Sequence, residues 1–117
     1  MARVVAYVPD LLFGSNVLGM LQAGGHEVKL ASQPGEVTGA LAGIDVLVVD
    51  LTADSAERIE QVRALALDPE TTRVLGFYSH VEADVRAQAE QAGFDLVIPR
   101  SRMAREGAQL VKRLSER

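Results

Sequence analysis

The residues with the clearest chemical potential each stand at the end of an apolar run. Asp10 follows the first run, Asp50 ends the third and Ser79 follows the fourth. Arg100 and Ser101 come directly after the fifth. Carboxylates bind cations, while hydroxyl and guanidinium groups bind phosphate. These positions are therefore the candidate site, with Ser79, Arg100 and Ser101 as the candidate phosphate or switch contacts.

The two carboxylates could hold a hard cation. Asp10, Asp50 and a backbone carbonyl, for which Thr52 is the candidate, would give oxygen ligands to Mg²⁺, with water completing the shell. A carboxylate beside such a cation can accept a phosphoryl group, because the metal offsets the charge that repels the donor. The sequence thus makes Asp50 the candidate phosphoacceptor and offers Mg²⁺ as the one candidate cofactor.

Two kinds of segment alternate along the chain and must position these residues. Apolar runs rich in Val, Ile and Leu predict strands buried on both faces of a parallel sheet, at residues 3–8, 27–31, 45–50, 74–78 and 96–99. Apolar residues at helical spacing predict helices over residues 16–23, 36–42, 56–67, 81–92 and 103–114. No interdomain linker stands out, so residues 1–117 are predicted to form a single domain.

This (βα)5 order predicts an α/β, flavodoxin-like fold. Right-handed crossovers give a doubly wound parallel sheet of five strands in the order 2-1-3-4-5. Such folds hold their sites at the carboxyl ends of the strands, near the switch point between strands 1 and 3. Asp10 and Asp50 follow those two strands, so we expect them at one edge of the sheet together with Ser79 and Arg100.

Four stretches carry a resemblance to a known family. "VVAYVPD" ends at Asp10, "DVLVVDL" contains Asp50, "VLGFYSH" contains Ser79 and "DLVIPRS" contains Pro99. Over its whole length the chain resembles the receiver domain of two-component response regulators. Receivers have an acidic pair after strand 1, a phosphoacceptor Asp ending strand 3, a Ser or Thr ending strand 4 and a Lys-Pro after strand 5. The resemblance implies the acceptor place for Asp50 and the hydroxyl place for Ser79.

The sequence departs from the receiver pattern at several of its specific positions. Pro9 occupies one of the two acidic places, and Ile98 stands where the lysine is expected. The "MP" and "DG" that commonly follow the acceptor are absent from "DLTADSAER", and strand 5 lacks the usual aromatic residue. The resemblance therefore implies an atypical, degenerate receiver-like domain in which phosphorylation of Asp50 is impaired or absent.

The candidate residues also have structural interpretations. Asp50 could cap the loop that follows a buried strand, and Asp10 could cap the next helix, which is the favoured of its two interpretations. Ser79 with Glu82 has the spacing of a helix capping box. Each of these three residues thus has two interpretations that the sequence leaves open.

Three further features stand near the candidate site. The "FGS" at residues 13–15 is interpreted as a loop that could form a small anion nest at a helix amino end. His26 and His80 lack ligand-like spacing and are predicted to be solvated loop histidines. Tyr7 and Tyr78 lie within apolar runs and are predicted to be core residues with a tethered hydroxyl.

Composition excludes several classes of protein. The chain has no cysteine, which excludes disulfides and thiolate metal sites. No apolar run approaches the roughly 20 residues that cross a membrane, and neither a signal segment nor a membrane contact is predicted. A net charge of -4 with 4% aromatic residues argues against nucleic-acid binding. We expect a cytoplasmic protein.

The charges are unevenly distributed. Residues 1–99 carry six basic and fourteen acidic side chains, whereas residues 100–117 carry six basic and two acidic ones. The basic segment contains Arg105, Lys112 and Arg113, which are the candidate interaction face for an acidic partner. Its alternative interpretation is a solvated helix face with cations near the carboxyl end, where the helix dipole favours them.

Three functions remain open at this point. The first is a stand-alone signalling module that is not an enzyme and binds a protein partner, either a kinase or an output protein. In the family it resembles, the face made by helix 4, strand 5 and helix 5 often forms dimers, so a homodimer is a second expectation. The alternatives are a small-ligand or anion-binding domain that uses residues 9–15 with Arg100, and a functional Mg²⁺-dependent phosphoacceptor.

Overall fold

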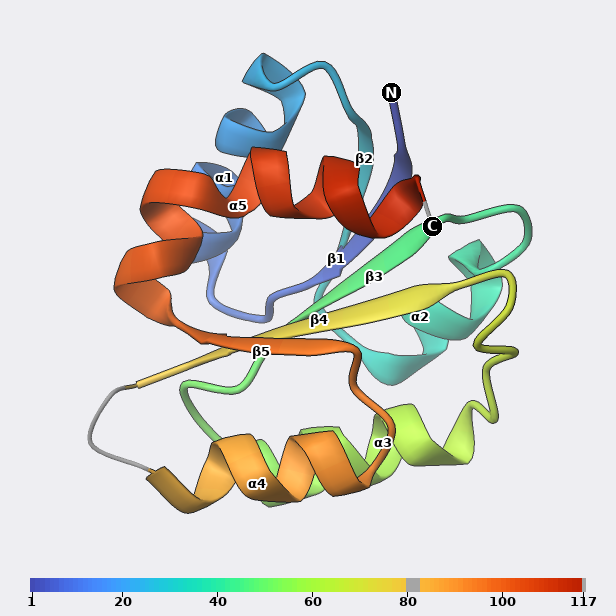
Figure 1. The fold of residues 1–117 in the computed structure, drawn as a ribbon, viewed down its shortest axis with the longest axis vertical. Helices are drawn as coiled ribbons and strands as arrows, with labels where there is room; N and C mark the ends of the chain where they lie inside the picture. The colour runs from blue at the N-terminus through green and yellow to red at the C-terminus, as the bar shows by residue number, and fades with distance from the viewer. Residues whose placement is uncertain (80–82, 117) are drawn as a thin grey trace.

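The predicted strands form one parallel sheet in the order β2-β1-β3-β4-β5 (Figure 1). The computed structural model of the protein describes residues 1–79 and 83–116. Its strands are β1 (Arg3–Tyr7), β2 (Glu27–Ala31), β3 (Val46–Asp50), β4 (Arg73–Tyr78) and β5 (Leu96–Pro99). Its helices are α1 (Leu11–Ala23), α2 (Pro34–Ala40), α3 (Ser55–Ala64), α4 (Ala83–Gln91) and α5 (Arg100–Ser115). The predicted fold class and strand order are confirmed.

Helices cover both faces of the sheet because side chains from alternate strand positions are apolar on both sides. One layer contains α1 and α5, which pack on Val48, Phe77 and Ile98. The opposite layer contains α2, α3 and α4, which pack on Tyr7, Val49 and other residues of the same face. Figure 1 shows α1 and α5 on one side of the strands, with α3 and α4 on the other. We call these the α1/α5 layer and the α2/α3/α4 layer.

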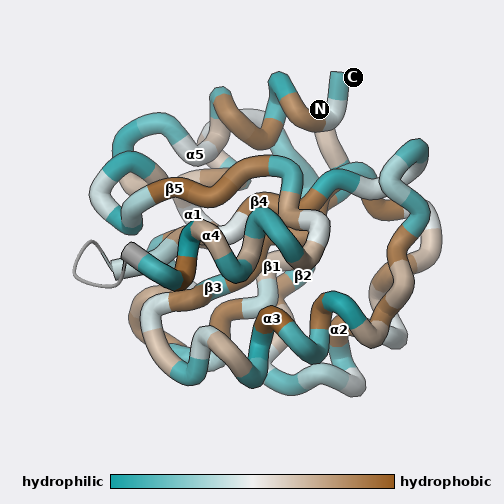
Figure 2. Tube along the Cα trace, turned by 60° about the horizontal axis from the view of Figure 1, so that its bottom comes forward, coloured by the Kyte–Doolittle hydropathy of each residue, from teal (hydrophilic) through white to brown (hydrophobic). Residues whose placement is uncertain are grey.

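The strand β3 is the most deeply buried element. All five of its residues are buried, because β1 and β4 pair with it on either side and helices cover both its faces. Figure 2 shows the resulting division, with hydrophobic colour along β5 and hydrophilic residues on the outer side of α4. A residue at the carboxyl end of β3 is therefore placed between two apolar layers, where a charge needs a partner.

The helix α1 begins at Leu11, whereas the sequence predicted a start at residue 16. Asp10 is the N-cap, and its Oδ1 accepts a hydrogen bond from the Phe13 N–H at 2.8 Å. The "FGS" stretch is thus helical, and the prediction of a loop with an anion nest was wrong. Gly14 faces the sheet, where a Cβ would lie 3.2 Å from the Leu30 side chain, so glycine lets α1 approach β2 closely.

The helix α5 begins at Arg100 instead of residue 103, directly after Pro99 at the N-cap position. The backbone of the described residues contains no cis peptide bond, so Ile98–Pro99 is trans. The predictions for His80 and for the capping box with Glu82 lie outside the described residues. In the part of the chain that the structure describes, no helix has the length and apolar character to cross a membrane.

The prediction of a solvated His26 was wrong. The residue is 6% exposed and lies at the amino-terminal edge of the sheet. Nδ1 accepts a hydrogen bond from the Ala2 N–H at 3.1 Å, and Nε2 lies 2.8 Å from the carbonyl oxygen of Ala108 in α5. The neutral tautomer with its proton on Nε2 satisfies both contacts. His26 therefore connects the start of β1 with α5.

Candidate functional site

Asp50 ends β3 and is almost fully enclosed, with the residue 3% exposed. Oδ1 accepts hydrogen bonds from the Thr52 N–H, at 2.8 Å, and from the Thr52 hydroxyl. Oδ2 lies 3.7 Å from Nη1 of Arg58. Asp50 thus caps the loop after β3, and both of its carboxylate oxygens face polar partners from the same chain.

Arg58 is the residue of this site that the sequence analysis missed. It lies on α3, its side chain is 10% exposed, and Nη1 donates a hydrogen bond to the backbone carbonyl of Asp50 at 2.7 Å. The signal that could have found it is helical spacing, because Arg58 and Val62 lie one turn apart on one face of α3 and Val62 is buried. An arginine at a core-facing position needs an acidic partner, and Asp50 is that partner.

Tyr7 forms the wall beside this ion pair. The Arg58 guanidinium lies over the Tyr7 ring, 5.9 Å from its centroid. The Tyr7 hydroxyl donates to Oε1 of Gln61 at 2.7 Å, which confirms the predicted tethered core tyrosine. Burial raises the pKa of the Tyr7 hydroxyl, and the positive charge of Arg58 opposes that rise. The guanidinium is therefore held between a carboxylate and an aromatic face.

The residues at this edge do not fit a Mg²⁺ site. Asp10 is exposed and uses Oδ1 to cap α1, while the Asp50 oxygens face Thr52 and Arg58. Within residues 1–79 and 83–116, no group of three or more His, Asp or Glu side chains lies close enough to hold a metal ion. Mg²⁺ requires several oxygen ligands in near-octahedral geometry. With these partners in place, the oxygen donors at this edge are already engaged within the chain.

The other predicted site residues gather in a separate cleft of about 360 Å³. Ser79, Arg100 and Ser101 line it, together with Phe13 from α1. The Arg100 guanidinium lies over the Phe13 ring, 5.3 Å from the centroid, and the Phe13 ring packs edge-on against Phe77. Asp50 is not among the lining residues. The predicted site residues at the carboxyl edge thus lie in two separate places. Asp50 belongs to an enclosed ion pair, whereas Ser79, Arg100 and Ser101 line an open cleft.

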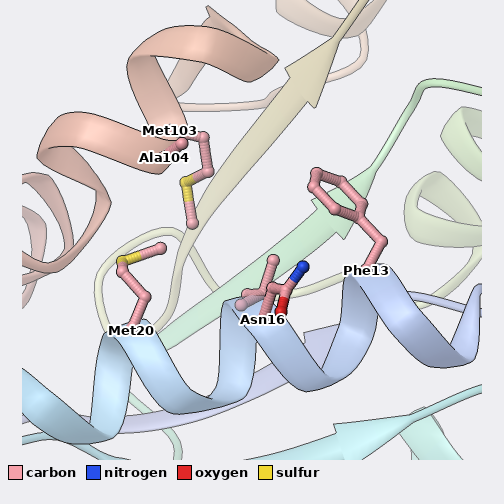
Figure 3. A pocket seen from close by; sticks show the side chains of 6 residues that line it. Phe13, Asn16, Met20, Met103 and Ala104 are labelled. Carbon is pink, nitrogen blue, oxygen red and sulfur yellow. The ribbon is translucent and has the colours of Figure 1, made fainter.

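A second hollow continues along the groove between α1 and α5. It measures about 170 Å³ and is lined mainly by apolar side chains, including Phe13, Met20 and Met103. Figure 3 shows the two methionine side chains facing each other across this groove, with Asn16 and Phe13 further along α1. Phe13 lines both hollows, which makes it the common wall between them.

The candidate interaction face lies on α5. Arg105, Lys112 and Arg113 are all exposed. Within the described ranges, none of the three forms an ion pair, whereas Arg102 pairs with Glu106 one turn along the same helix. The positive charge of these three residues therefore faces solvent without an internal counter-charge.

Comparisons with known proteins give structural matches. No family model matches the sequence, and no curated protein matches it significantly. A response regulator from Thermotoga maritima is 18% identical with a TM-score of 0.83, and the match covers 100% of this chain and 99% of that one. A response regulator receiver domain from Clostridium thermocellum is 18% identical with a TM-score of 0.84, over 99% and 95% of the two chains. The chemotaxis response regulator CheY4 of Vibrio cholerae is 19% identical with a TM-score of 0.79, over 97% and 98%.

The chain has the fold of a response-regulator receiver domain. Within this receiver fold, the position that the resemblance assigned to lysine is held by Ile98, which is 1% exposed. Ile98 pairs in register with Phe77 of β4, which in turn pairs with Asp50 of β3. The three residues form one row across the sheet. Ile98 packs in the α1/α5 layer and has no charge to offer Asp50.

Proposed function

We propose that this chain is a signalling module of the receiver fold that acts by binding a protein partner, with phosphorylation of Asp50 impaired or absent. The observation that supports it most is the environment of Asp50, whose side chain is 4% exposed and faces Thr52 and Arg58. A phosphoryl donor must reach a carboxylate oxygen, and the partners inside the chain shield both oxygens. The signal would then pass through contact with a partner, without phosphoryl transfer.

The face that we propose for this contact consists of α4, β5 and the basic residues of α5. Arg105 and Lys112 lie seven residues apart, which places them on the same side of the helix, and Arg113 adjoins them. Residues 1–99 are strongly acidic, so the basic residues of α5 stand out from the rest of the molecule. An acidic protein surface is the partner that this charge distribution favours.

A capture experiment with two matched variants tests this face. We expect the immobilised chain to enrich one protein from extracts of its source cell, and Arg105→Glu/Lys112→Glu to abolish that enrichment. The control, Lys29→Glu/Arg63→Glu, changes the net charge equally at exposed positions on β2 and α3 and should keep it. Equal capture by both double variants would count against the α5 face.

A second copy of the chain is the other candidate for the same face. The helix α4 presents Asp84 and Glu90, while α5 presents Arg105 and Lys112, so the face carries both signs of charge. Such a face can pair with itself about a two-fold axis. Sedimentation velocity should then show a dimer that dissociates in the Arg105→Glu/Lys112→Glu variant. A monomer at every concentration would exclude it.

Beryllofluoride separates the proposal from a working phosphoacceptor. With Mg²⁺ and beryllofluoride, or with acetyl phosphate, we expect the amide spectrum of the native chain to stay unchanged, because the Asp50 oxygens are enclosed. A spectral shift that Asp50→Asn removes would instead establish Asp50 as the phosphoacceptor. It would contradict the proposal that phosphorylation of Asp50 is impaired or absent.

One observation favours anion binding as a second candidate function. Arg100, Ser101 and Ser79 line the open cleft of about 360 Å³, and the first turn of α5 has no side-chain cap. Inorganic phosphate should then raise the melting temperature, and Arg100→Ala should remove the effect. Arg63→Ala on α3 is the control, since it also removes one exposed arginine. No phosphate effect in the native chain would exclude this candidate.

A further inference from the structure

The ion pair at the carboxyl end of β3 is built from two buried charges. The side chains of Asp50 and Arg58 are 4% and 10% exposed. A buried carboxylate is stable only with a compensating charge and hydrogen bonds. Among the residues that the structure describes, Arg58 is the cation that forms an ion pair with Asp50. The negative charge of Asp50 is thus balanced from inside the chain.

The guanidinium of Arg58 is held on several sides. Nη1 donates to the Asp50 backbone carbonyl at 2.7 Å and lies 3.7 Å from Oδ2. Nη2 lies 3.9 Å from Oδ2 of Asp54, and the guanidinium lies over the Tyr7 ring. Because Asp50, Asp54 and the Tyr7 ring all contact the guanidinium, its positive charge is held at a defined position beside Asp50.

Arg58 belongs to the layer opposite to that of Ile98, the position that the resemblance assigned to lysine. Ile98 lies in the α1/α5 layer, and Phe77 stands between it and Asp50 in the sheet. Arg58 approaches from α3, in the α2/α3/α4 layer. A metal ion at Oδ2 of Asp50 would have to displace the guanidinium or lie next to a like charge.

We propose that Arg58 is a built-in counter-cation of Asp50, which takes the charge position that a divalent ion would otherwise fill and fixes the carboxyl edge in a single, metal-independent state. Arg58 is in this sense a positioning residue for Asp50 and the Thr52 loop. The inference deepens the proposed function, because a site with its own cation needs neither Mg²⁺ nor a phosphoryl group. It concerns cation binding alone, so it can fail while partner capture succeeds, and the reverse.

A cation titration tests the inference directly. The native chain should show no saturable change in the amide signals of residues 50–52 with millimolar Mg²⁺, and no saturable broadening with Mn²⁺. Arg58→Gln removes the positive charge and should bring cation binding at these signals, on the order of tenfold tighter or more than in the native chain. Asp50→Asn/Arg58→Gln should lose that binding again. Saturable Mg²⁺ binding by the native chain, or no gain in Arg58→Gln, would overturn the inference.

Two further variants separate charge from fold. Arg58→Lys keeps the positive charge and should bind Mg²⁺ no better than the native chain. Arg63→Gln removes an exposed arginine from the same helix and should also leave cation binding unchanged. If Arg58→Gln does not fold, melting temperatures decide the question. The double variant Asp50→Asn/Arg58→Gln should then melt above Asp50→Asn alone, since no charge is left buried without a partner. A double variant that melts below Asp50→Asn would refute the pairing.

Discussion

At the scale of single residues, the important feature is that the polar groups around Asp50 already have partners. Asp50 faces Thr52 and Arg58, and the Arg58 guanidinium contacts the Tyr7 ring. The Tyr7 hydroxyl in turn donates to Gln61. A network in which every member is satisfied tends to be rigid, because any movement leaves a buried group without its partner. This explains why we expect a fixed state at this edge.

Tyr7 gives this network a pH dependence. Burial raises the pKa of its hydroxyl above the usual value of 10.0. The stability that Tyr7 contributes is therefore complete below about pH 10 and is lost as the pH rises through the higher folded-state pKa. We expect the free energy of unfolding, measured with urea, to fall over that range.

Tyr7→Phe should lack this component of the fall, although it also removes the hydrogen bond to Gln61 and lowers stability at every pH. Tyr78→Phe is the matched control and should keep it. If Tyr7→Phe and the native chain lose stability in parallel above pH 10, Tyr7 is not the group responsible.

At the scale of elements, the ends of α1 and α5 decide what the carboxyl edge looks like. Asp10 caps α1 at Leu11, which turns the "FGS" stretch into helix and brings Phe13 over the start of α5. The position of Phe13 next to Arg100 then closes one side of the open cleft. A single cap thus shapes the wall of the cleft.

The cap can be measured separately from metal binding. Asp10→Ala should cost about 1 kcal/mol in the free energy of unfolding, because the Phe13 N–H loses its acceptor. Asp10→Asn keeps an oxygen at the cap and should lose much less. Urea unfolding with and without Mg²⁺ checks both. A Mg²⁺-dependent loss in Asp10→Ala would show that Asp10 binds the metal instead.

The other end of the same layer depends on His26. Its ring joins the Ala2 N–H to the Ala108 carbonyl, and so ties α5 to the start of β1. His26→Leu should destabilise the chain by about 2 kcal/mol, because two buried polar groups lose their partners. Gln22→Leu, at an exposed position on α1, is the control and should have little effect on urea unfolding. A similar loss of stability in both variants would contradict the role of His26 in joining α5 to the start of β1.

At the scale of the whole molecule, the positive charge beside Asp50 comes from one helical layer and not from the other. The α1/α5 layer is apolar at Ile98, while the α2/α3/α4 layer provides Arg58. Asp50, Phe77 and Ile98 form one row across the sheet, so a cation added at residue 98 would be a second buried charge that competes with Arg58 for Asp50. The receiver fold is thus combined with a counter-cation that comes from α3.

A lysine introduced at residue 98 tests this arrangement. Ile98→Lys should lower the free energy of unfolding by about 3 kcal/mol, because the new ammonium is buried without a carboxylate of its own. The loss should be smaller in the Arg58→Gln background, where Asp50 is free to pair with the lysine. Ile98→Met conserves apolar volume and is the control in urea unfolding. Equal losses of unfolding free energy in both backgrounds would show that Arg58 and a lysine at residue 98 do not compete for Asp50.

The sequence alone determined the fold and the edge at which the polar residues gather. Apolar runs separated by helical patterns permit few arrangements, since parallel strands need helical crossovers of one hand. The positions of Asp10, Asp50, Ser79 and Arg100 at strand ends follow from that order. Helix starts were less well predicted, because the cap at Asp10 competes with the turn signal of Gly14, and glycine inside α1 is tolerated by its packing on Leu30.

Tertiary structure decided which of these residues share an environment. Arg58 is separated from Asp50 by a loop and a helical turn, and its burial depends on the angle at which α3 meets the sheet, which no local pattern records. His26 is buried only because Ala108, far along the chain, packs over it. Spacing fixes the face and the end of an element on which a residue lies. Burial and charge pairing depend on contacts between elements, so only the folded chain shows that Asp50 has a cation of its own.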